Sequence, residues 1–219
     1  MHKTVQNLIT IQNQIKSILG NVNEIKLPKI IAVSKTFKID KILPLIEYGH
    51  SDFGENKVQE AIDKWTEIKS NNPNIHLHMI GKLQTNKVKF AVKLFDYIHS
   101  VDSEKLAKKI ADEQLKIKKN LKIFIQVNVG DETQKSGINI NETNNLVIFC
   151  KKLNLDVIGL MCIPPVDSDP TTYFEELDKI NKISNFKELS MGMSSDYLKA
   201  VKYNSTYLRI GSNIFGPRH

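Results

Sequence analysis

Apolar residues follow two different spacings along this chain. Residues 4–18 carry apolar side chains every three or four positions, which is the spacing of an amphipathic helix, and Gly20 and Asn21 end the pattern. From residue 30 onward, short apolar runs alternate with further stretches of helical spacing. We therefore expect segment 1–21 to pack as an additional helix on a larger body built from strands and helices.

The short apolar runs predict buried strands, because they are uninterrupted and are bounded by polar or glycine residues. Eight such strands are expected, at residues 30–33, 52–53, 75–80, 97–101, 121–129, 157–161, 188–190 and 206–210. Stretches of helical spacing follow them and end near residues 46, 69, 95, 116, 153, 184 and 203, with a final turn after the last strand. This alternation predicts an α/β protein whose single domain, 1–219, is a (β/α)8 TIM barrel rather than an open doubly wound sheet.

Composition narrows the class of protein. Hydrophobic residues make up 41% and charged residues 25% of the 219 residues, as in soluble globular proteins. No apolar stretch approaches the roughly 20 residues that span a bilayer, and the first residues lack the pattern of a signal peptide. Cys150 and Cys162 form neither a disulfide framework nor a metal-binding spacing. We expect a cytoplasmic protein without a metal site and without membrane contact.

The net charge of +7 raises the question of nucleic acid binding. Basic residues are spread along the chain, with one short cluster at 116–119, and no arginine-rich arm or zinc-finger spacing occurs, so we expect no nucleic acid partner. Of the 31 basic residues only Arg209 and Arg218 are arginines. Because Arg209 lies in an apolar stretch, its site is expected to need a planar, permanently charged group.

Lys35 follows the first predicted strand and would lie at its carboxyl end, where barrels collect their ligands. Two interpretations are open for this lysine. It is either a solvated charge that ends a strand, or an amine in a partly dry pocket whose lowered pKa lets it attack a carbonyl and form an imine.

The last two strands predict an anion site. Gly211 and Ser212 combine a close backbone approach with a hydroxyl at a helix start, and Ser194 offers a second hydroxyl after the preceding strand. Gly211 and Ser212 alone also suit a plain helix cap. With Lys35 on one wall, this cradle on the opposite wall and Arg209 between them, pyridoxal 5'-phosphate (PLP) satisfies all three; a barrel isomerase or aldolase that binds a sugar phosphate is the alternative.

Seven motifs favour PLP over a sugar phosphate as the ligand. In chain order they are IAVSKT (31–36), FGENKVQE (53–60), HMIGKLQTNK (78–87), KSG (135–137), GLM (159–161), LSMGMS (189–194) and RIGSNIFG (209–216). Together they closely resemble the YggS/PROSC family of pyridoxal phosphate homeostasis proteins. The resemblance covers nearly all of the chain beyond the leading helix, and it implies a barrel of the alanine racemase N-terminal type.

The resemblance also implies the cofactor-binding residues, which are Lys35, Asn56, Ser194, Arg209, Gly211 and Ser212. In this reading Lys35 carries the Schiff base, Arg209 lies near the pyridine nitrogen, and Asn56 lies beside the ring. The other three hold the phosphate. An arginine near the nitrogen would leave it unprotonated and weaken the ring as an electron sink.

Two positions depart from the family pattern. Leu77 stands where tryptophan is common, which suggests a different cavity wall near the third strand, and Ser212 replaces a common threonine. His78 has two open interpretations, as a cavity-facing group or as a core histidine with its hydrogen bonds satisfied.

The resemblance implies a protein that regulates the supply of PLP without an established catalytic turnover. The alternative is a PLP-dependent amino-acid racemase, but racemases of this barrel type take a second base from another domain and a partner subunit. Because the chain stops soon after the eighth strand, we expect no such domain, an open site and a monomer. Apo-enzymes that need PLP are candidate partners, and a second PLP site on the lysine-rich surface is not predictable.

Overall fold

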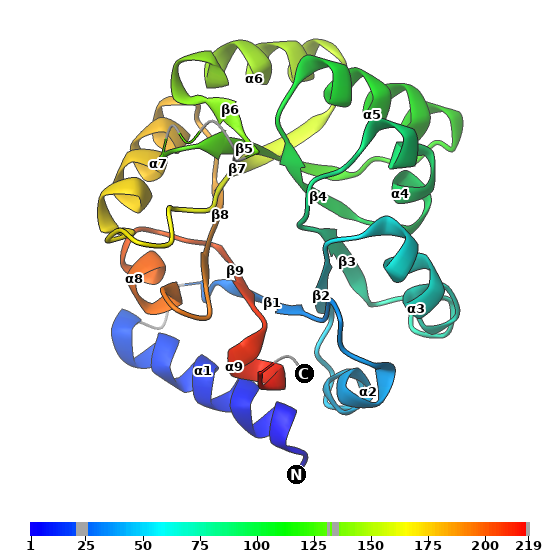
Figure 1. Ribbon diagram of the computed structural model, residues 1–219, viewed down its shortest axis with the longest axis vertical. Helices are drawn as coiled ribbons and strands as arrows, with labels where there is room; N and C mark the ends of the chain where they lie inside the picture. Colours follow the sequence, from blue (N-terminus) through cyan, green and yellow to red (C-terminus); the bar gives the residue numbers. More distant parts are fainter. Residues whose placement is uncertain (21–25, 131, 133–135, 218–219) are drawn as a thin grey trace.

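Eight parallel strands close into a barrel within the part of the chain that the computed structural model describes, residues 1–20, 26–130, 132 and 136–217 (Figure 1). They are β1 Lys29–Val33, β2 Asp52–Glu55, β3 His76–Met79, β4 Tyr97–Val101, β5 Lys122–Asn128, β7 Asp156–Cys162, β8 Glu188–Met193 and β9 Tyr207–Ile210. Each strand pairs with its neighbours in chain order, β4 pairs with β5 and β9 with β1, so that the ring is closed. The predicted TIM barrel is confirmed.

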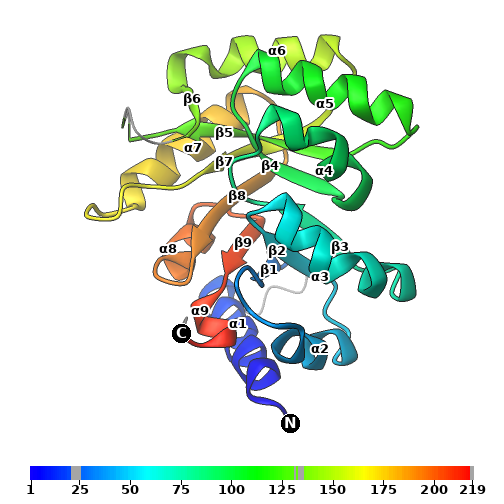
Figure 2. The same ribbon diagram turned by 45° about the vertical axis from the view of Figure 1, so that its right-hand side comes forward.

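Helices cover the outside of the barrel, as the views in Figures 1 and 2 show. They are α1 Lys3–Leu19, α2 Ile39–Glu47, α3 Val58–Asn71, α4 Val88–Leu94, α5 Glu104–Lys116, α6 Thr143–Lys152, α7 Thr171–Ile183, α8 Tyr197–Lys202 and α9 Ser212–Phe215, with 3-10 turns at Thr85–Lys87 and Ile140–Glu142. Their positions match the expected alternation, although α6 begins earlier than its apolar stretch suggested.

Three strands differ clearly from the prediction, and the first is β2, which extends to Glu55, two residues beyond its expected end. β8 extends to Met193, three residues beyond its expected end, because its backbone remains beside β9 as far as Arg209. A short strand, β6 Ile138–Asn139, was not predicted, and it pairs with Val127 and Asn128 of β5. It lies in a polar segment without the apolar run by which strands are recognised, so only the fold creates it.

The strands bury side chains on both faces. The outward faces and the helices form the main hydrophobic core, which includes Trp65, Phe95 and Phe174. The inward faces form a second cluster around Tyr97 and Phe124. This double burial explains the uninterrupted apolar runs in the sequence. Polar residues that interrupt an inward face are therefore candidates for a function.

The leading helix α1 lies against α8 and α9, and Figure 2 shows it beside α9 from a second direction. Its buried face includes Leu8 and Ile11, as the helical spacing predicted. Asn7 donates a hydrogen bond from Nδ2 to the carbonyl oxygen of Ile214 at 2.9 Å. Asn21, at the expected end of this segment, lies outside the described residues. The additional helix is confirmed and is tied to the element that follows the last strand.

The described part of the chain also bears on the sequence-based expectations for the two cysteines and for the length of the helices. Cys150 and Cys162 are free and buried, and burial raises the pKa of each thiol to about 12. Among the described residues no helix is long and apolar enough to cross a membrane.

Candidate functional site

The six predicted site residues lie on or just after the carboxyl-terminal parts of four neighbouring strands, β2, β1, β9 and β8. The strand register sets their relative heights: Val33 pairs with Gly54, Ala32 with Ile210, and Met193 with Arg209. The expected cradle therefore lies beside Lys35 rather than on the opposite wall. That expectation was wrong because closure of a barrel makes its first and last strands neighbours.

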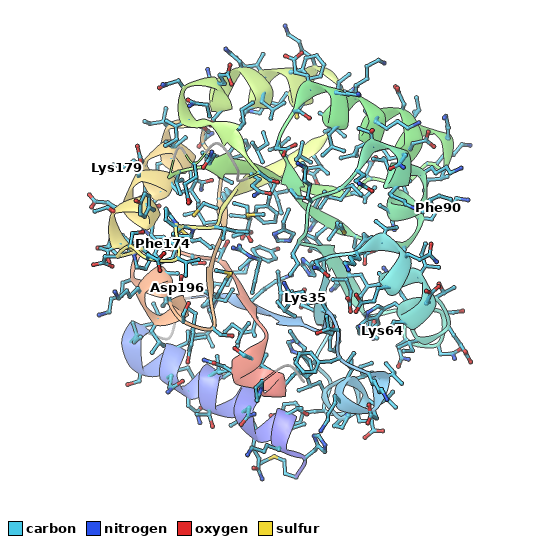
Figure 3. All side chains as sticks on the ribbon, in the orientation of Figure 1. Lys35, Lys64, Phe90, Phe174, Lys179 and Asp196 are labelled. Carbon is cyan, nitrogen blue, oxygen red and sulfur yellow. The ribbon has the colours of Figure 1, made fainter. Side chains whose placement is uncertain are left out.

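Lys35 is half-buried and lies close to the middle of the ring of strands, whereas Lys179 lies at the outer surface (Figure 3). The turn that carries it is held on both sides. The Lys64 ammonium donates to the carbonyl oxygen of Ser34 at 2.9 Å, and the Thr36 N–H donates to Glu60 at 2.6 Å. This second contact fixes Thr36 in a left-handed conformation, with φ of 68°, which is unusual for a β-branched residue.

A buried carboxylate organises this turn. Glu55, at the end of β2, is fully buried and accepts hydrogen bonds at Oε1 from Ser34 Oγ (2.8 Å), Lys64 (2.9 Å) and Trp65 Nε1 (3.0 Å). Its other oxygen, Oε2, has no hydrogen-bond partner. Burial would raise the pKa of Glu60, but the Thr36 N–H and the Lys64 charge lower it below its ordinary value. These hydrogen bonds therefore hold the turn that carries Lys35 in one conformation.

Arg209 is a buried cation inside the barrel, with 4% of its surface exposed. Its NH1 donates to the carbonyl oxygen and to Oγ of Ser190, both at 2.7 Å, and its NH2 donates to the carbonyl oxygen of Cys162 at 2.8 Å. Burial lowers the pKa of the guanidinium, and the nearby charge of Asp196 opposes this effect. The planar fork that the sequence suggested is used here to fix the plane of the side chain.

The loops after β8 and β9 meet at Ser194. Its Oγ accepts from the N–H groups of Gly211 (3.2 Å) and Asn213 (3.4 Å), and its carbonyl oxygen accepts from Asn213 Nδ2 at 2.9 Å. A side chain on Gly211 would contact the carbonyl oxygen of Val33 at 3.4 Å. Ser212 is exposed. Hydroxyls and backbone N–H groups thus converge, which is the donor set that suits an anion.

Asn56 comes directly after the end of β2. It lines a cavity of about 480 Å³ with Gly81, Gln84 and three lysines, Lys57, Lys82 and Lys87. Its Oδ1 is buried without a hydrogen-bond partner. Gly81 permits this packing, because a Cβ there would lie 2.4 Å from the Asn56 carbonyl oxygen.

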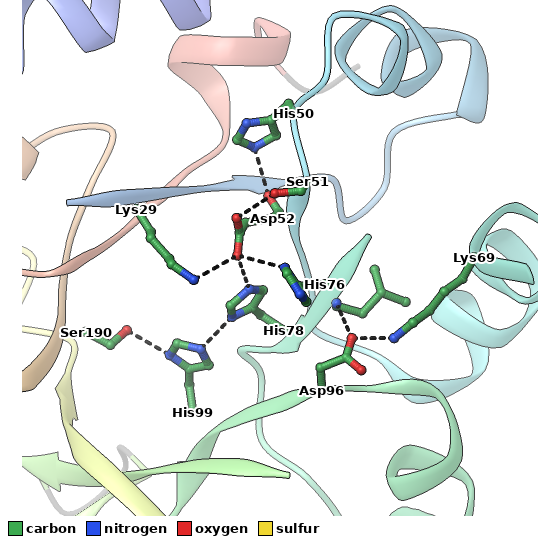
Figure 4. Close-up of polar contacts among 11 residues, drawn as sticks. Lys29, His50, Ser51, Asp52, Lys69, His76, His78, Asp96, His99 and Ser190 are labelled. Atoms are coloured by element: carbon green, nitrogen blue, oxygen red, sulfur yellow. Dashed lines mark hydrogen bonds and ion pairs between the residues drawn. The ribbon is translucent and has the colours of Figure 1, made fainter. Parts of the chain in front are cut away.

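His78 is a core histidine rather than a cavity group. Its ring is fully buried, stacks on Tyr97, and has partners at both nitrogens: His99 at 3.0 Å and Asp52 at 3.1 Å. His99 in turn contacts Ser190 Oγ at 2.8 Å (Figure 4). Sequence reasoning singled out neither His99 nor Asp52. A signal existed for His99, a polar residue at alternate spacing from Tyr97 within an apolar strand.

Comparisons with known proteins show the family to which this chain belongs. A model of the family "Alanine racemase, N-terminal domain" matches residues 7–219. The pyridoxal phosphate homeostasis protein of Pasteurella multocida is 36% identical over 228 residues, with 97% of each chain covered. That of Escherichia coli K12 is 34% identical and covers 86% of this chain and 85% of its own. The chain belongs to the family of pyridoxal phosphate homeostasis proteins.

Solved structures extend the comparison. PipY of Synechococcus elongatus, in a structure with PLP bound, superimposes with a TM-score of 0.85 at 30% identity and covers 97% of this chain and 100% of its own. The alanine racemase of Clostridium difficile 630 has a TM-score of 0.71 at 15% identity; this chain covers 57% of it and shares its fold. The predicted alanine-racemase-type barrel is confirmed.

The fold places Leu77 away from the barrel interior. Leu77 is fully buried in the core between strands and helices, while His78, its neighbour, faces the barrel interior. The expectation that Leu77 alters the cavity wall was therefore wrong, because adjacent residues of a strand face opposite sides. Lys135 of the KSG motif lies outside the described residues.

Proposed function

We propose that this chain binds PLP covalently through Lys35 and regulates the supply of the cofactor in the cell. The observation that carries the proposal is the convergence of Lys35, Arg209 and the Ser194 loop at one end of the barrel. The names of the family relatives and the PLP-bound PipY structure support it.

The described residues fit this cofactor. The carboxyl end of β1 offers one half-buried amine, on Lys35, and the Ser194–Gly211 contact gathers N–H and hydroxyl groups beside it. Asn56 Oδ1 is a buried acceptor without a partner, which a bound polar molecule would satisfy. The combination of an amine, an anion cradle and a fixed guanidinium matches an aldehyde, a phosphate and a ring nitrogen.

PLP supplies an aldehyde that condenses with amines and a ring that withdraws electrons when its nitrogen is protonated. In our proposal, Lys35 Nζ bonds to the aldehyde carbon as a Schiff base, and one water is released. Ser194, Gly211 and Ser212 hold the phosphate, and Asn56 lies beside the ring. Arg209 faces the ring nitrogen and, as a cation, disfavours its protonation. This arrangement favours holding the cofactor over turning substrates over.

The biological role follows from that arrangement. We propose a PLP carrier and regulator that acts in the cytoplasm as a monomer, without catalytic turnover, and whose candidate partners are apo-enzymes. The relatives match the chain over most of both lengths, and their name, pyridoxal phosphate homeostasis protein, supports the regulatory part of this role.

The decisive experiment is covalent trapping. Purified protein is incubated with PLP, reduced with borohydride and digested, and the labelled peptide is mapped. We expect the label on Lys35 and a visible absorption band that disappears in Lys35→Ala. Lys38→Ala is the matched control, because Lys38 is an exposed lysine three residues away. Label that persists at full yield in Lys35→Ala would refute the covalent assignment.

A separate assay tests the absence of turnover. The PLP-loaded protein is incubated with single L-amino acids, and the products are separated on a chiral column. We expect no racemisation at ordinary enzyme rates, whereas sustained turnover of about 1 per second or more would instead establish an amino-acid racemase.

A further inference from the structure

A chain of hydrogen-bonded polar side chains crosses the interior of the barrel from Arg209 to the opposite mouth, and Figure 4 shows its part from Ser190 to Asp52. The links are Arg209 NH1 to Ser190 Oγ (2.7 Å), Ser190 Oγ to His99 Nδ1 (2.8 Å), His99 Nε2 to His78 Nδ1 (3.0 Å) and His78 Nε2 to Asp52 Oδ1 (3.1 Å). Ser190, His99 and His78 are at most a fraction of a percent exposed. Asp52 begins β2 and lines a cavity of about 210 Å³ at the amino-terminal mouth.

The two ends of this hydrogen-bond chain, together with neutral histidines, determine the direction of every hydrogen bond in it. Arginine can only donate, and an ionised carboxylate can only accept. Ser190 therefore accepts from Arg209 and donates to His99 Nδ1, His99 donates from Nε2 to His78, and His78 donates from Nε2 to Asp52. Both histidines are then neutral, with the proton on Nε2. The reverse order at His99 would require His78 to donate from both nitrogens, that is, to be a buried imidazolium.

The surroundings favour the neutral form. Burial lowers the pKa of His78 although Asp52 opposes this effect, and burial lowers the pKa of His99 well below the ordinary value, with the charge of Arg209 acting in the same direction. Burial alone would raise the pKa of Asp52, but hydrogen bonds from His78 and Ser51 and the charge of Lys29 lower it to about 2. Asp52 is therefore ionised at neutral pH.

Other groups also face the Asp52 end. Lys29 Nζ lies 4.0 Å and His76 Nδ1 lies 3.8 Å from Oδ1 of Asp52. Ser51 donates to Oδ2 at 3.0 Å, and the His50 ring contacts the Asp52 carbonyl oxygen at 2.9 Å. These contacts hold the carboxylate in place and keep it charged, so the acceptor end of the chain is fixed.

We propose that Asp52, His78, His99 and Ser190 form a one-directional hydrogen-bond chain that positions Arg209 against the cofactor's ring nitrogen. This hydrogen-bond chain keeps a lone pair of Ser190 directed at the guanidinium of Arg209. Its other end is the negatively charged Asp52. His78 and His99 are positioning residues, which act on the cofactor only through Arg209. This inference rests on the proposed function.

The first experiment needs no cofactor. Full-length protein labelled with nitrogen-15 in its histidines is examined by NMR at neutral pH. We expect both His78 and His99 to be neutral and protonated on Nε2. A proton on Nδ1 of His99, or an imidazolium at His78, would overturn the proposed direction of the chain.

The second experiment separates the chain from simple packing. His99 stacks on Phe124 at 4.3 Å between ring centroids. His99→Phe keeps a ring there and breaks the chain, whereas His99→Gln retains one acceptor and one donor and loses the stacking. We expect the PLP dissociation constant to rise about tenfold in His99→Phe, as for one lost hydrogen bond, with a shifted absorption band. His99→Gln should retain the wild-type band and affinity.

The outcomes are distinguishable. If wild-type protein binds PLP and His99→Phe has the same affinity and band, the positioning role is refuted, whatever happens to thermal stability. If His99→Gln is folded but lacks the wild-type absorption band, the change in the band is caused by the lost ring stacking, and the positioning role of the hydrogen-bond chain is again refuted. If wild-type protein takes up no PLP at all, the proposed function fails and the positioning role fails with it.

Discussion

At the scale of single residues, the candidate site depends on buried charges that are held by several partners. Glu55 illustrates this, because one of its oxygens accepts from Ser34, Lys64 and Trp65 at once. Burying a carboxylate is costly unless it is paired and hydrogen-bonded. A second carboxylate, Glu60, accepts from the N–H of Thr36 and holds its unusual backbone, and strain of this kind persists only where its surroundings over-determine it. Buried charge and a strained backbone, both of which are destabilising, thus accompany the fixed position of Lys35.

Replacing this carboxylate should therefore cost both stability and cofactor retention. We expect Glu55→Gln to lower the free energy of unfolding by about 2–3 kcal/mol, since Lys64 loses a buried charged partner. PLP should also dissociate faster, because the turn that bears Lys35 is less rigid. Urea unfolding and stopped-flow release measure the two effects. Asp63→Asn is the control, because Asp63 is an exposed carboxylate on α3, the helix that carries Lys64, and its loss should change stability by less than about 0.5 kcal/mol. Equal stability of the two variants would contradict this reading.

At the scale of elements, the site depends on a helix that contributes none of the six site residues. α1 packs against α8 and α9, the two short helices that follow the strands β8 and β9. Besides the Asn7 contact to Ile214, Tyr197 donates a hydrogen bond from its hydroxyl to Gln14. Short helices are marginal on their own, so packing must stabilise them. α1 therefore supports the loops that carry Ser194 and Ser212.

This support can be tested at Leu8, which is 1% exposed. We expect Leu8→Ala to lower the free energy of unfolding by about 2–5 kcal/mol, the usual range for a truncated core leucine. Thr10→Ala, on the exposed face of the same helix, should change it by less than about 0.5 kcal/mol. Denaturant titration of both variants measures the difference. Similar unfolding midpoints would show that α1 is not docked as described.

At the scale of the whole molecule, the barrel interior contains titratable groups where most barrels contain aliphatic side chains. His78 and His99 are fully buried among aromatic rings, and His50 lies at the amino-terminal mouth. Burial lowers the pKa of all three below the ordinary value of 6.5. Folding is therefore linked to the protonation of these groups.

The sign of this linkage is definite. Below pH 6.5 the unfolded chain binds protons at these histidines that the folded chain does not, so stability is complete above pH 6.5 and is lost as pH falls. Each histidine contributes a slope of up to about 1.4 kcal/mol per pH unit. Urea unfolding between pH 7.5 and 5.5 measures the slope, and His99→Gln should reduce it by about one proton. A flat profile over this range would contradict the neutral state of the buried histidines.

Much of the site was predictable because it follows directly from chain order. Lys35, Asn56 and Ser212 each come just after an apolar run, and in a closed barrel all such positions share one end. The role of Glu55 and the Asp52 chain were not predictable in the same way. His99 and Ser190 are 91 residues apart in sequence, and nothing local in the sequence indicates that they are in contact.

The sequence by itself determined the elements, the barrel, the family and the set of candidate residues, because hydrophobic spacing and motif order are local properties of the chain. The tertiary structure alone decided which of these residues are neighbours. It placed the anion cradle beside Lys35, turned Leu77 outward and linked Arg209 to Asp52. The physical reason is that side-chain direction and barrel closure depend on pairings between distant strands, which only the folded chain brings together.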